Sequence, residues 1–216
     1  MGQRLVFKCM KDDKCFATLY YHWSAYTMSV YAEGCDIVKG LKSRNWTKDM
    51  SVKETIAILL DILESNISVI DTNCHGGVSG GTDSAEWKAL IEMGITPHEG
   101  EHVDRTYGLL DVTEEGMENA LYWAEDIEEI NFDECYFTNG CFIVFDMNDK
   151  YEHEDLAEIC ENYGDVDKMD IPDLPEIFRN TIIPFDKAEE TQELARKYNN
   201  TFILGKLGTE IYTSIA

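Results

Sequence analysis

The chain has 216 residues, of which 44% are hydrophobic and 11% aromatic, enough for one sizeable core with or without an extension. Its net charge of −24 opposes direct binding to nucleic acid and to anionic membranes, and most of the excess acid follows residue 50. We find no apolar run approaching roughly 18 residues and no long apolar stretch near the first residue. These features predict a cytoplasmic protein that does not cross a membrane.

The cysteines predict no metal ribbon and no redox motif. None of the seven forms a C-x-x-C pair, and their number is odd. Most lie among apolar residues, which favours reduced, buried thiols. They are Cys9, Cys15, Cys35, Cys74, Cys135, Cys141 and Cys160.

The first third of the chain predicts a hairpin followed by two helices. Alternating apolar residues indicate strands at 4–10 and 16–21, joined by the polar four-residue segment 11–14. A helix is expected from about 27 to 41, although Gly34 and Gly40 weaken that prediction. The clearest helix is 51–65, where Ser51 and Glu54 form a capping box ahead of an apolar stripe.

The middle of the chain predicts alternating strands and helices. We expect short strands at 67–70 and 107–112, with a helix from about 84 to 93 between them. Thr113 is expected to cap a long, strongly acidic helix that ends near 130. Residues 135–145 read as two strand pieces around Asn139-Gly140, a hairpin signal, or alternatively as one bulged strand.

The last part of the chain changes character near residue 150. Its predicted elements are an acidic helix at 151–163, a linker at 170–175, a helix at 186–198 and strands at 201–204 and 210–214. We therefore predict a core domain over 1–150 and an acidic extension over 151–216 that packs on it. Paired strands with interspersed helices favour the α+β class with a mostly antiparallel sheet.

A glycine-rich stretch from His75 to Asp83 contains S-G-G-x-D-S, which is also the signature of enzymes that cleave ATP between its α and β phosphates. Such a loop needs a buried parallel strand running directly into it. Eight residues of loop composition precede Ser79 here, so we favour a helix cap in which Asp83 accepts from the helix and Glu86 returns the bond. Phosphate or nucleotide binding by His75, Gly77, Ser79, Gly80, Gly81 and Asp83 remains the alternative.

The segment HEGEH at 98–102 spells the zinc-protease pattern H-E-x-x-H. That pattern needs both histidines on one turn of a helix. Pro97 precedes His98, and Gly100 lies between the two histidines, which disfavours a helix at this point. We expect no metal, and any metal that bound would use His98 and His102.

The aromatic segment YYHWSAYT at 20–27 is the second dense group of polar and aromatic residues. Rings with hydroxyl and imidazole groups can stack on a planar ligand and hydrogen-bond it. We name His22, Trp23, Ser24 and Tyr26 as candidate ligand-binding residues, with a core strand as the alternative. A Ser24–His22 nucleophile pair has no acid in the sequence nearby to orient the histidine.

Three segments of the chain form a further pattern: MGQRL at 1–5, YYHWSAYT, and RTYGLLDVTEEGM at 105–117 followed by WAE at 123–125. In these segments the chain resembles a group of uncharacterised phage and prophage proteins of Gram-positive bacteria. The resemblance covers about residues 1–150. It implies a small phage-type protein in the host cytoplasm, and it assigns no reaction and therefore no catalytic residue.

These observations favour a non-enzymatic binding protein, with counter-defence as one expected role. Its expected partner is a basic host protein facing the acidic segment 113–134, or a nucleotide-like small molecule held by the aromatic and glycine-rich segments. The alternative is an enzyme: a nucleotide hydrolase using S-G-G-x-D-S or a metal-dependent hydrolase using HEGEH. No cofactor is predicted, and the oligomeric state is left open.

Overall fold

The computed structural model describes eleven stretches of the chain. They are residues 4–22, 24–25, 29–65, 74–75, 77–98, 101–102, 108–138, 142–146, 182–197, 201–207 and 210–213. The strand predicted at 67–70, the helix at 151–163 and the linker at 170–175 lie outside these residues.

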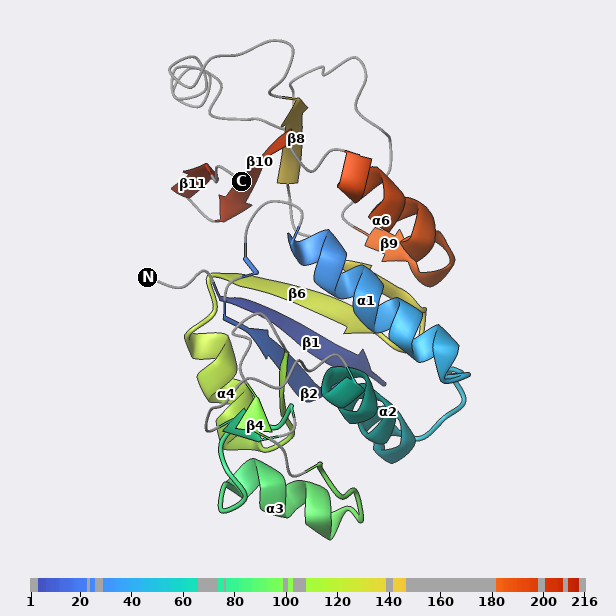
Figure 1. Cartoon of the computed structure of the whole chain (residues 1–216), viewed down its shortest axis with the longest axis vertical. Coiled ribbons are helices and arrows are strands. Elements are labelled where there is room, and N and C mark those ends of the chain that lie inside the picture. Colours follow the sequence, from blue (N-terminus) through green and yellow to red (C-terminus); the bar gives the residue numbers. More distant parts are fainter. Residues whose placement is uncertain are drawn as a thin grey trace.

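A mixed six-stranded sheet forms the centre of the fold (Figure 1). Its strands follow the order β5-β2-β1-β6-β7-β9, in which β1 and β6 are parallel and the other neighbours antiparallel. The α+β class with a mostly antiparallel sheet is therefore confirmed. The strands are β1 (Leu5–Lys11), β2 (Lys14–Tyr21), β5 (Leu109–Asp111), β6 (Asp126–Asn131), β7 (Tyr136–Thr138) and β9 (Ile182–Pro184).

The predicted hairpin of β1 and β2 is confirmed, but its turn is shorter than expected. Lys11 pairs with Lys14, so Asp12 and Asp13 alone form the loop. Both have positive φ, 50° and 58°, as a type I′ hairpin turn requires. Asp tolerates that conformation better than most residues, and the Asp12 N–H donates to the Asp133 carboxylate at 2.7 Å.

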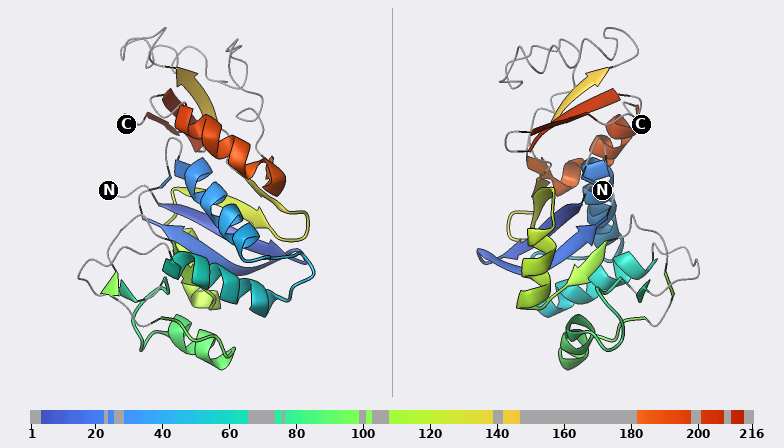
Figure 2. Two further views of the ribbon diagram at one scale, coloured as in Figure 1. Left: turned by 45° about the vertical axis from the view of Figure 1, so that its right-hand side comes forward. Right: turned by 90° about the vertical axis from the view of Figure 1, so that its left-hand side faces the viewer.

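Helices cover both faces of this sheet. The helices α1 (Ser29–Ser43) and α2 (Val52–Ser65) lie on one face, and α4 (Glu114–Tyr122) lies on the other (Figure 2, right). Alternation along the strands produces this arrangement, because every second residue of a strand faces the same side. Phe7, Leu19 and Ile130 belong to the buried cluster beneath α1 and α2.

The start of α2 has the predicted capping box. The Ser51 N–H donates to the Glu54 carboxylate at 2.8 Å, and the Glu54 N–H donates to Ser51 Oγ at 3.3 Å. Of the predicted apolar stripe, Ile56, Leu59, Leu60 and Leu63 are buried. This helix is therefore specified both by its cap and by its apolar periodicity.

The two glycines of α1 are contact points rather than helix breaks. A Cβ on Gly34 would lie 2.6 Å from the Phe137 ring, and a Cβ on Gly40 would lie 2.7 Å from Ile62 Cγ1. Both positions therefore let a neighbouring element approach the helix backbone closely.

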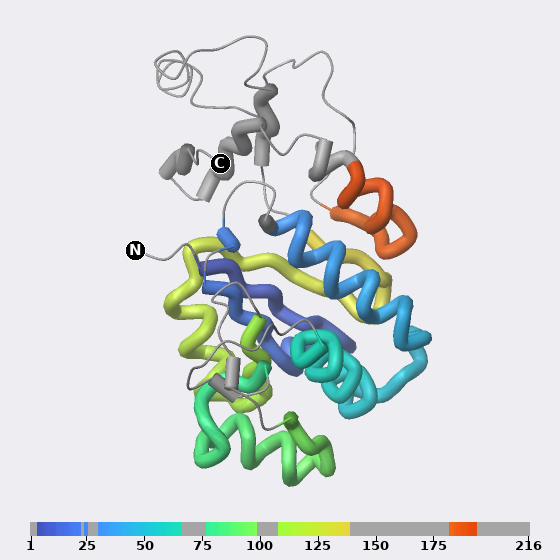
Figure 3. Tube along the Cα trace, viewed as in Figure 1, coloured from blue at the N-terminus to red at the C-terminus, as the bar shows by residue number. Residues whose placement is uncertain are grey.

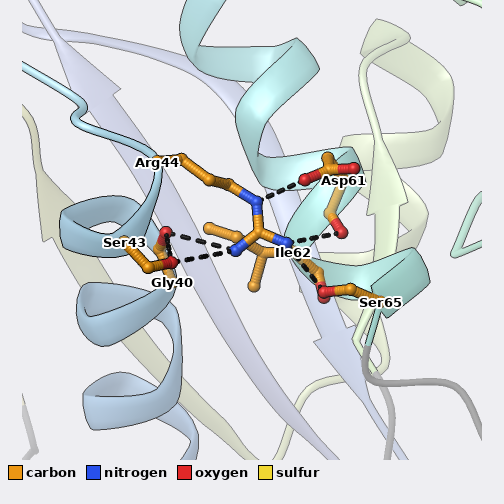
Figure 4. Close-up of polar contacts among 6 residues, drawn as sticks. All are labelled: Gly40, Ser43, Arg44, Asp61, Ile62 and Ser65. Atoms are coloured by element: carbon orange, nitrogen blue, oxygen red, sulfur yellow. Dashed lines mark hydrogen bonds and ion pairs between the residues drawn. The ribbon is translucent and has the colours of Figure 1, made fainter.

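Arg44 then ties the end of α1 to α2 (Figure 4). Its guanidinium donates to the Gly40 carbonyl at 3.3 Å, to Ser65 Oγ at 2.8 Å and to the Asp61 carboxylate.

The long helix predicted for 113–130 is wrong. The helix α4 ends at Tyr122, and residues 126–131 form β6, which pairs in parallel with β1 from Leu5↔Asp126 to Met10↔Asn131. The helix propensity of the Glu-rich segment is overridden because pairing with β1 places this segment inside the sheet, where Ile130 is completely buried. The consequence is that Asp126 and Glu128 point into the core, at 5% and 2% exposure, rather than outward.

The predicted hairpin around Asn139-Gly140 is also wrong, and so is the single bulged strand. The strand β7 lies in the six-stranded sheet, whereas β8 (Phe142–Asp146) pairs with β10 (Thr201–Leu207), which in turn pairs with β11 (Glu210–Thr213). The predicted strands near 201 and 210 are confirmed. Sequence spacing cannot show that β7 finds its second partner in β9, far along the chain.

Residues 182–197 complete the described core. The strand β9 leads into a 3₁₀ turn (Phe185–Lys187) and then α6 (Ala188–Lys197), which confirms the predicted helix near 186–198. Ile183, Phe185 and Ala188 are buried. The helix α6 lies alongside α1 (Figure 3), where Gln192 accepts from Lys39 and donates to Asp36.

Replacing Gly40 with Ala should destabilise the fold by about 1–2 kcal/mol, because the new methyl overpacks Ile62 by more than its helix propensity returns. The measurement is urea denaturation of G40A in the wild-type background and in an I62A background. In the I62A background the same change should cost nothing or stabilise. An equal cost in both backgrounds would show that Ile62 is not the constraint.

Replacing Asp126 with Asn should stabilise the protein at pH 8 by about 2–3 kcal/mol and have little effect at pH 4. Burial is the main cause that raises the pKa of Asp126, to about 6, although hydrogen bonds from Glu128 and from the Ile127 backbone lower it. Because the folded pKa exceeds the unfolded value, this carboxyl contributes stability at low pH and loses it as the pH rises through about 6.

Chemical denaturation of D126N across pH 4–8 measures this effect, with the exposed D49N as the matched control. If D126N is less stable than the wild type by the same amount at pH 4 and at pH 8, this account is contradicted.

Candidate functional site

The glycine-rich stretch lies against the edge strand β5. The Leu110 N–H donates to the Gly77 carbonyl at 2.7 Å, and the Ser79 N–H donates to the Leu110 carbonyl at 3.2 Å. Val78 thus forms a single parallel bridge with Leu110 rather than ending a longer strand. These bonds fix Ser79 beside the end of β5.

The helix cap predicted at Asp83 is wrong by one residue. The helix α3 (Ala85–Glu92) is capped by Ser84, whose Oγ accepts from the Trp87 N–H at 3.1 Å. Asp83 is exposed, and its carbonyl accepts from Lys88 Nζ at 2.7 Å. Ser and Asp cap helices about equally well, so the sequence alone could not separate the two. Glu86 then falls in the first turn of α3.

A pocket of about 420 Å³ lies between α4, the end of β2, β5 and the Ser79 loop. It brings together two residues that the sequence named, His22 and Ser79, from separate segments. Its full lining is Arg4, Tyr20, His22, Ser79, Glu86, Leu109, Asp111, Gly116, Asn119, Ala120 and Trp123. The volume falls within the range of small-molecule sites.

One end of the pocket is acidic. A Cβ atom added at Gly116 would lie 2.6 Å from Glu86 Oε1 and 3.1 Å from Asp111 Oδ1, so the two carboxyl groups are close neighbours. Thr113 caps α4 as predicted, accepting from the Gly116 N–H at 3.1 Å, and its hydroxyl donates to Glu86 at 3.3 Å. Only a glycine at 116 leaves this approach open.

Asp111 is the least satisfied polar group of the pocket. It is 4% exposed, and among the described residues its Oδ1 has no hydrogen-bond partner. Burial is the main cause that raises the pKa of Asp111, to about 7, the negative charge of Glu86 raises it further, and a hydrogen bond with the Ser79 side chain lowers it. Near neutral pH this carboxyl therefore exists in both protonation states.

Thr18, directly across the sheet from Asp111, repeats this feature. The two residues pair between β2 and β5, and Thr18 is fully buried. Its hydroxyl also lacks a hydrogen-bond partner within the described part of the chain. Native proteins rarely leave two adjacent buried polar groups unpaired, and such groups call for an explanation in terms of a bound group or function.

The other end of the pocket is cationic and aromatic. The Arg4 guanidinium lies 5.6 Å from the centre of the Trp123 ring and donates to the Glu125 carboxylate at 3.4 Å. Tyr20 Oη and His22 Nδ1 are 2.9 Å apart. Burial raises the pKa of Tyr20, and the nearby charge of Arg4 counteracts it. A ligand in this pocket thus meets two carboxyl groups at one end and the Arg4 guanidinium, paired with Glu125, at the other.

Of the remaining predicted residues of the aromatic segment, Ser24 does not line the pocket. Ser24 is buried and donates to Glu33 at 2.9 Å, so it supports the start of α1 instead. Trp23 and Tyr26 lie outside the described residues, and of His75 only the backbone, in the short strand β3 (Cys74–His75), is described.

The glycines of the predicted loop have backbone roles. Gly77 and Gly80 have positive φ, 71° and 79°, which shapes the loop that passes β5 and leads into α3. The Gly81 carbonyl accepts from the Ser84 N–H at 2.8 Å. These residues position Ser79 and Ser84 rather than line the pocket.

The two histidines of HEGEH do not share a helical turn. Residue 98 lies in an irregular segment, where its N–H donates to Glu64 at 2.5 Å, while His102 belongs to the strand β4 (Glu101–His102) that pairs with β3. Within the described ranges no group of three or more His, Cys, Asp or Glu side chains is placed to hold a metal ion.

Sequence reasoning missed most of the pocket. Arg4, Tyr20, Glu86, Asp111, Asn119 and Trp123 all line it. The one available signal was Asp111, a carboxylate that follows the apolar pair Leu109-Leu110 near the end of the predicted strand 107–112, next to a helix cap. Strand ends that lead into helix starts often carry functional groups.

Comparison with protein-family models, with curated proteins and with solved structures gave no match. Among the helices that the structure describes, none combines the length and the apolar character needed to span a membrane. The pocket itself is therefore the basis for assigning a function.

Proposed function

We propose that this chain is a binding protein that holds a nucleotide-like small molecule in the pocket beneath α4. The observation that carries the proposal is the buried Asp111 carboxyl, whose Oδ1 has no partner among the residues that the structure describes, in a pocket that also gathers Ser79 and His22. Unpaired buried polar groups inside a concave site are what a polar ligand would satisfy.

The pocket's chemistry supports a ligand with a ring and an anionic group. Trp123, 56% exposed, offers an aromatic surface, and Arg4 supplies positive charge beside it. Hydrogen-bonding groups follow at the acidic end, in Ser79 and Asp111. A nucleoside or nucleoside monophosphate combines these features and suits a volume of about 420 Å³.

The charges also indicate which way such a ligand lies. A phosphate bound next to Ser79 would face the carboxyl groups of Glu86 and Asp111, which repel it. This repulsion argues against the ATP-cleaving interpretation of S-G-G-x-D-S. The phosphate belongs at the end with Arg4 and His22, where the Trp123 ring lies against the guanidinium, and the base belongs at the acidic end.

A basic protein partner is less well supported. Of the acidic residues in 113–134, Asp126 and Glu128 are buried, and Glu125 and Glu129 form ion pairs with Arg4 and Lys8. The continuous acidic face that such a partner would need is therefore broken up. Within the phage setting that the resemblance implies, sequestering a host nucleotide signal fits the pocket better.

The test is isothermal titration calorimetry with a panel of nucleosides and nucleoside 5′-monophosphates. Wild-type protein should bind at least one of them, and S79A should weaken that binding about tenfold, because one hydrogen bond to the ligand or to Asp111 is lost. The exposed T82A, which removes a hydroxyl from the same loop, is the matched control and should not change the affinity.

Two outcomes would contradict the proposal. One is the absence of binding by every member of the panel at millimolar concentration. The other is binding that S79A leaves unchanged. A melting curve of each variant separates lost binding from lost folding.

A further inference from the structure

The acidic end of the pocket carries two carboxyl groups with different environments. Glu86 is partly exposed in the first turn of α3, where a negative charge complements the helix dipole. Asp111 is almost completely buried at the end of β5. A ligand at this end therefore meets two side chains that differ in their readiness to carry a charge.

We propose that this end binds the amino-bearing edge of a nucleobase, with Asp111 contacting the ring nitrogen and Glu86 accepting from the exocyclic amine. The inference rests on the proposed function, and it selects adenine- and cytosine-type bases over hypoxanthine- and uracil-type bases. The members of each pair differ by an amino group in place of a carbonyl oxygen.

Asp111 has the hydrogen-bonding capacity that a basic ring nitrogen needs. When protonated, its carboxyl donates through O–H and accepts through the other oxygen. Because burial and the charge of Glu86 raise its pKa to about 7, the protonated form is abundant below neutral pH.

Glu86 supplies the discrimination between amino and carbonyl groups. Its carboxylate accepts from Thr113 at 3.3 Å and lies beside Asp111, facing the same space. An exocyclic amine donates to this carboxylate, whereas a carbonyl oxygen at that position would place two acceptors against each other. A mismatched edge of this kind also leaves buried polar groups of the site unpaired.

The groups around Asp111 determine how its binding depends on pH. These groups are Ser79 in the loop before α3, Glu86 in α3, and Thr113 and Gly116 at the start of α4. Arg4 and His22 lie at the opposite end of the pocket. Glu86 is the charged neighbour that acts on Asp111, so ionisation of Asp111 places two negative charges side by side and removes the donor for the ring nitrogen.

The test measures the affinities of adenosine, inosine, cytidine and uridine by calorimetry at pH 6 and pH 8.5. Adenosine should bind at least about tenfold more tightly than inosine, and cytidine at least about tenfold more tightly than uridine, because a matched bidentate edge discriminates by about this factor or more. Wild-type affinity for the amino-bearing nucleosides should fall at pH 8.5.

Two variants divide the roles of the carboxyl groups. D111N keeps one donor and one acceptor, so it should keep the preference and lose the pH dependence. E86Q can donate as well as accept, so it should reduce the preference for amino over carbonyl. Melting curves identify any variant that fails to fold, and in that case the wild-type preference and pH profile still decide the matter.

Each contrary result has its own meaning. If all four nucleosides bind equally, or the carbonyl-bearing ones bind more tightly, this inference is overturned while the proposed function stands. If none of the four binds and the monophosphates also fail, both are overturned. A pH dependence that persists unchanged in D111N would show that Asp111 is not the group whose ionisation weakens binding.

Discussion

The parallel pairing of β1 with β6 is the constraint from which the candidate site follows. Both β5 and β6 run parallel to β1, so the connection between them must cross β2 and β1 on one face, and α4 is that crossover. The register also places Arg4 next to Glu125, whose N–H donates to the Arg4 carbonyl at 2.8 Å. The crossover helix and Arg4 are two walls of the pocket.

This topology places groups of opposite charge at the two ends of one pocket. Asp111 stands where β5 ends, and Gly116 allows the first turn of α4 to approach it. At pH values above the pKa of Asp111, burying its ionised carboxylate costs free energy of folding. The hydrogen bond from Ser79 only partly offsets this cost. Polar groups held at such a cost are concentrated at functional sites, and for this reason the pocket outweighs the acidic surface in assigning a function.

Local patterns in the sequence predict the elements whose signals are local. The β1–β2 hairpin, the capping box of α2 and the cap at Thr113 each depend on residues a few positions apart. Such patterns do not predict the strand at 126–131, because this strand forms by pairing with β1, which is far away in the sequence. For the same reason His22 and Ser79 could be named as candidates, while the pocket that joins them to Asp111 could not be foreseen.

The most direct test of a ligand site beneath α4 is a titration of the ¹⁵N-labelled protein with adenosine, followed through its backbone amide signals. We predict that the perturbed amides cluster at Ser79, Asp111, Gly116 and Asn119, which surround the pocket from three separate segments. Perturbations confined to the α1 and α2 face, or none at saturating adenosine, cytidine and their monophosphates, would contradict a ligand site at this place.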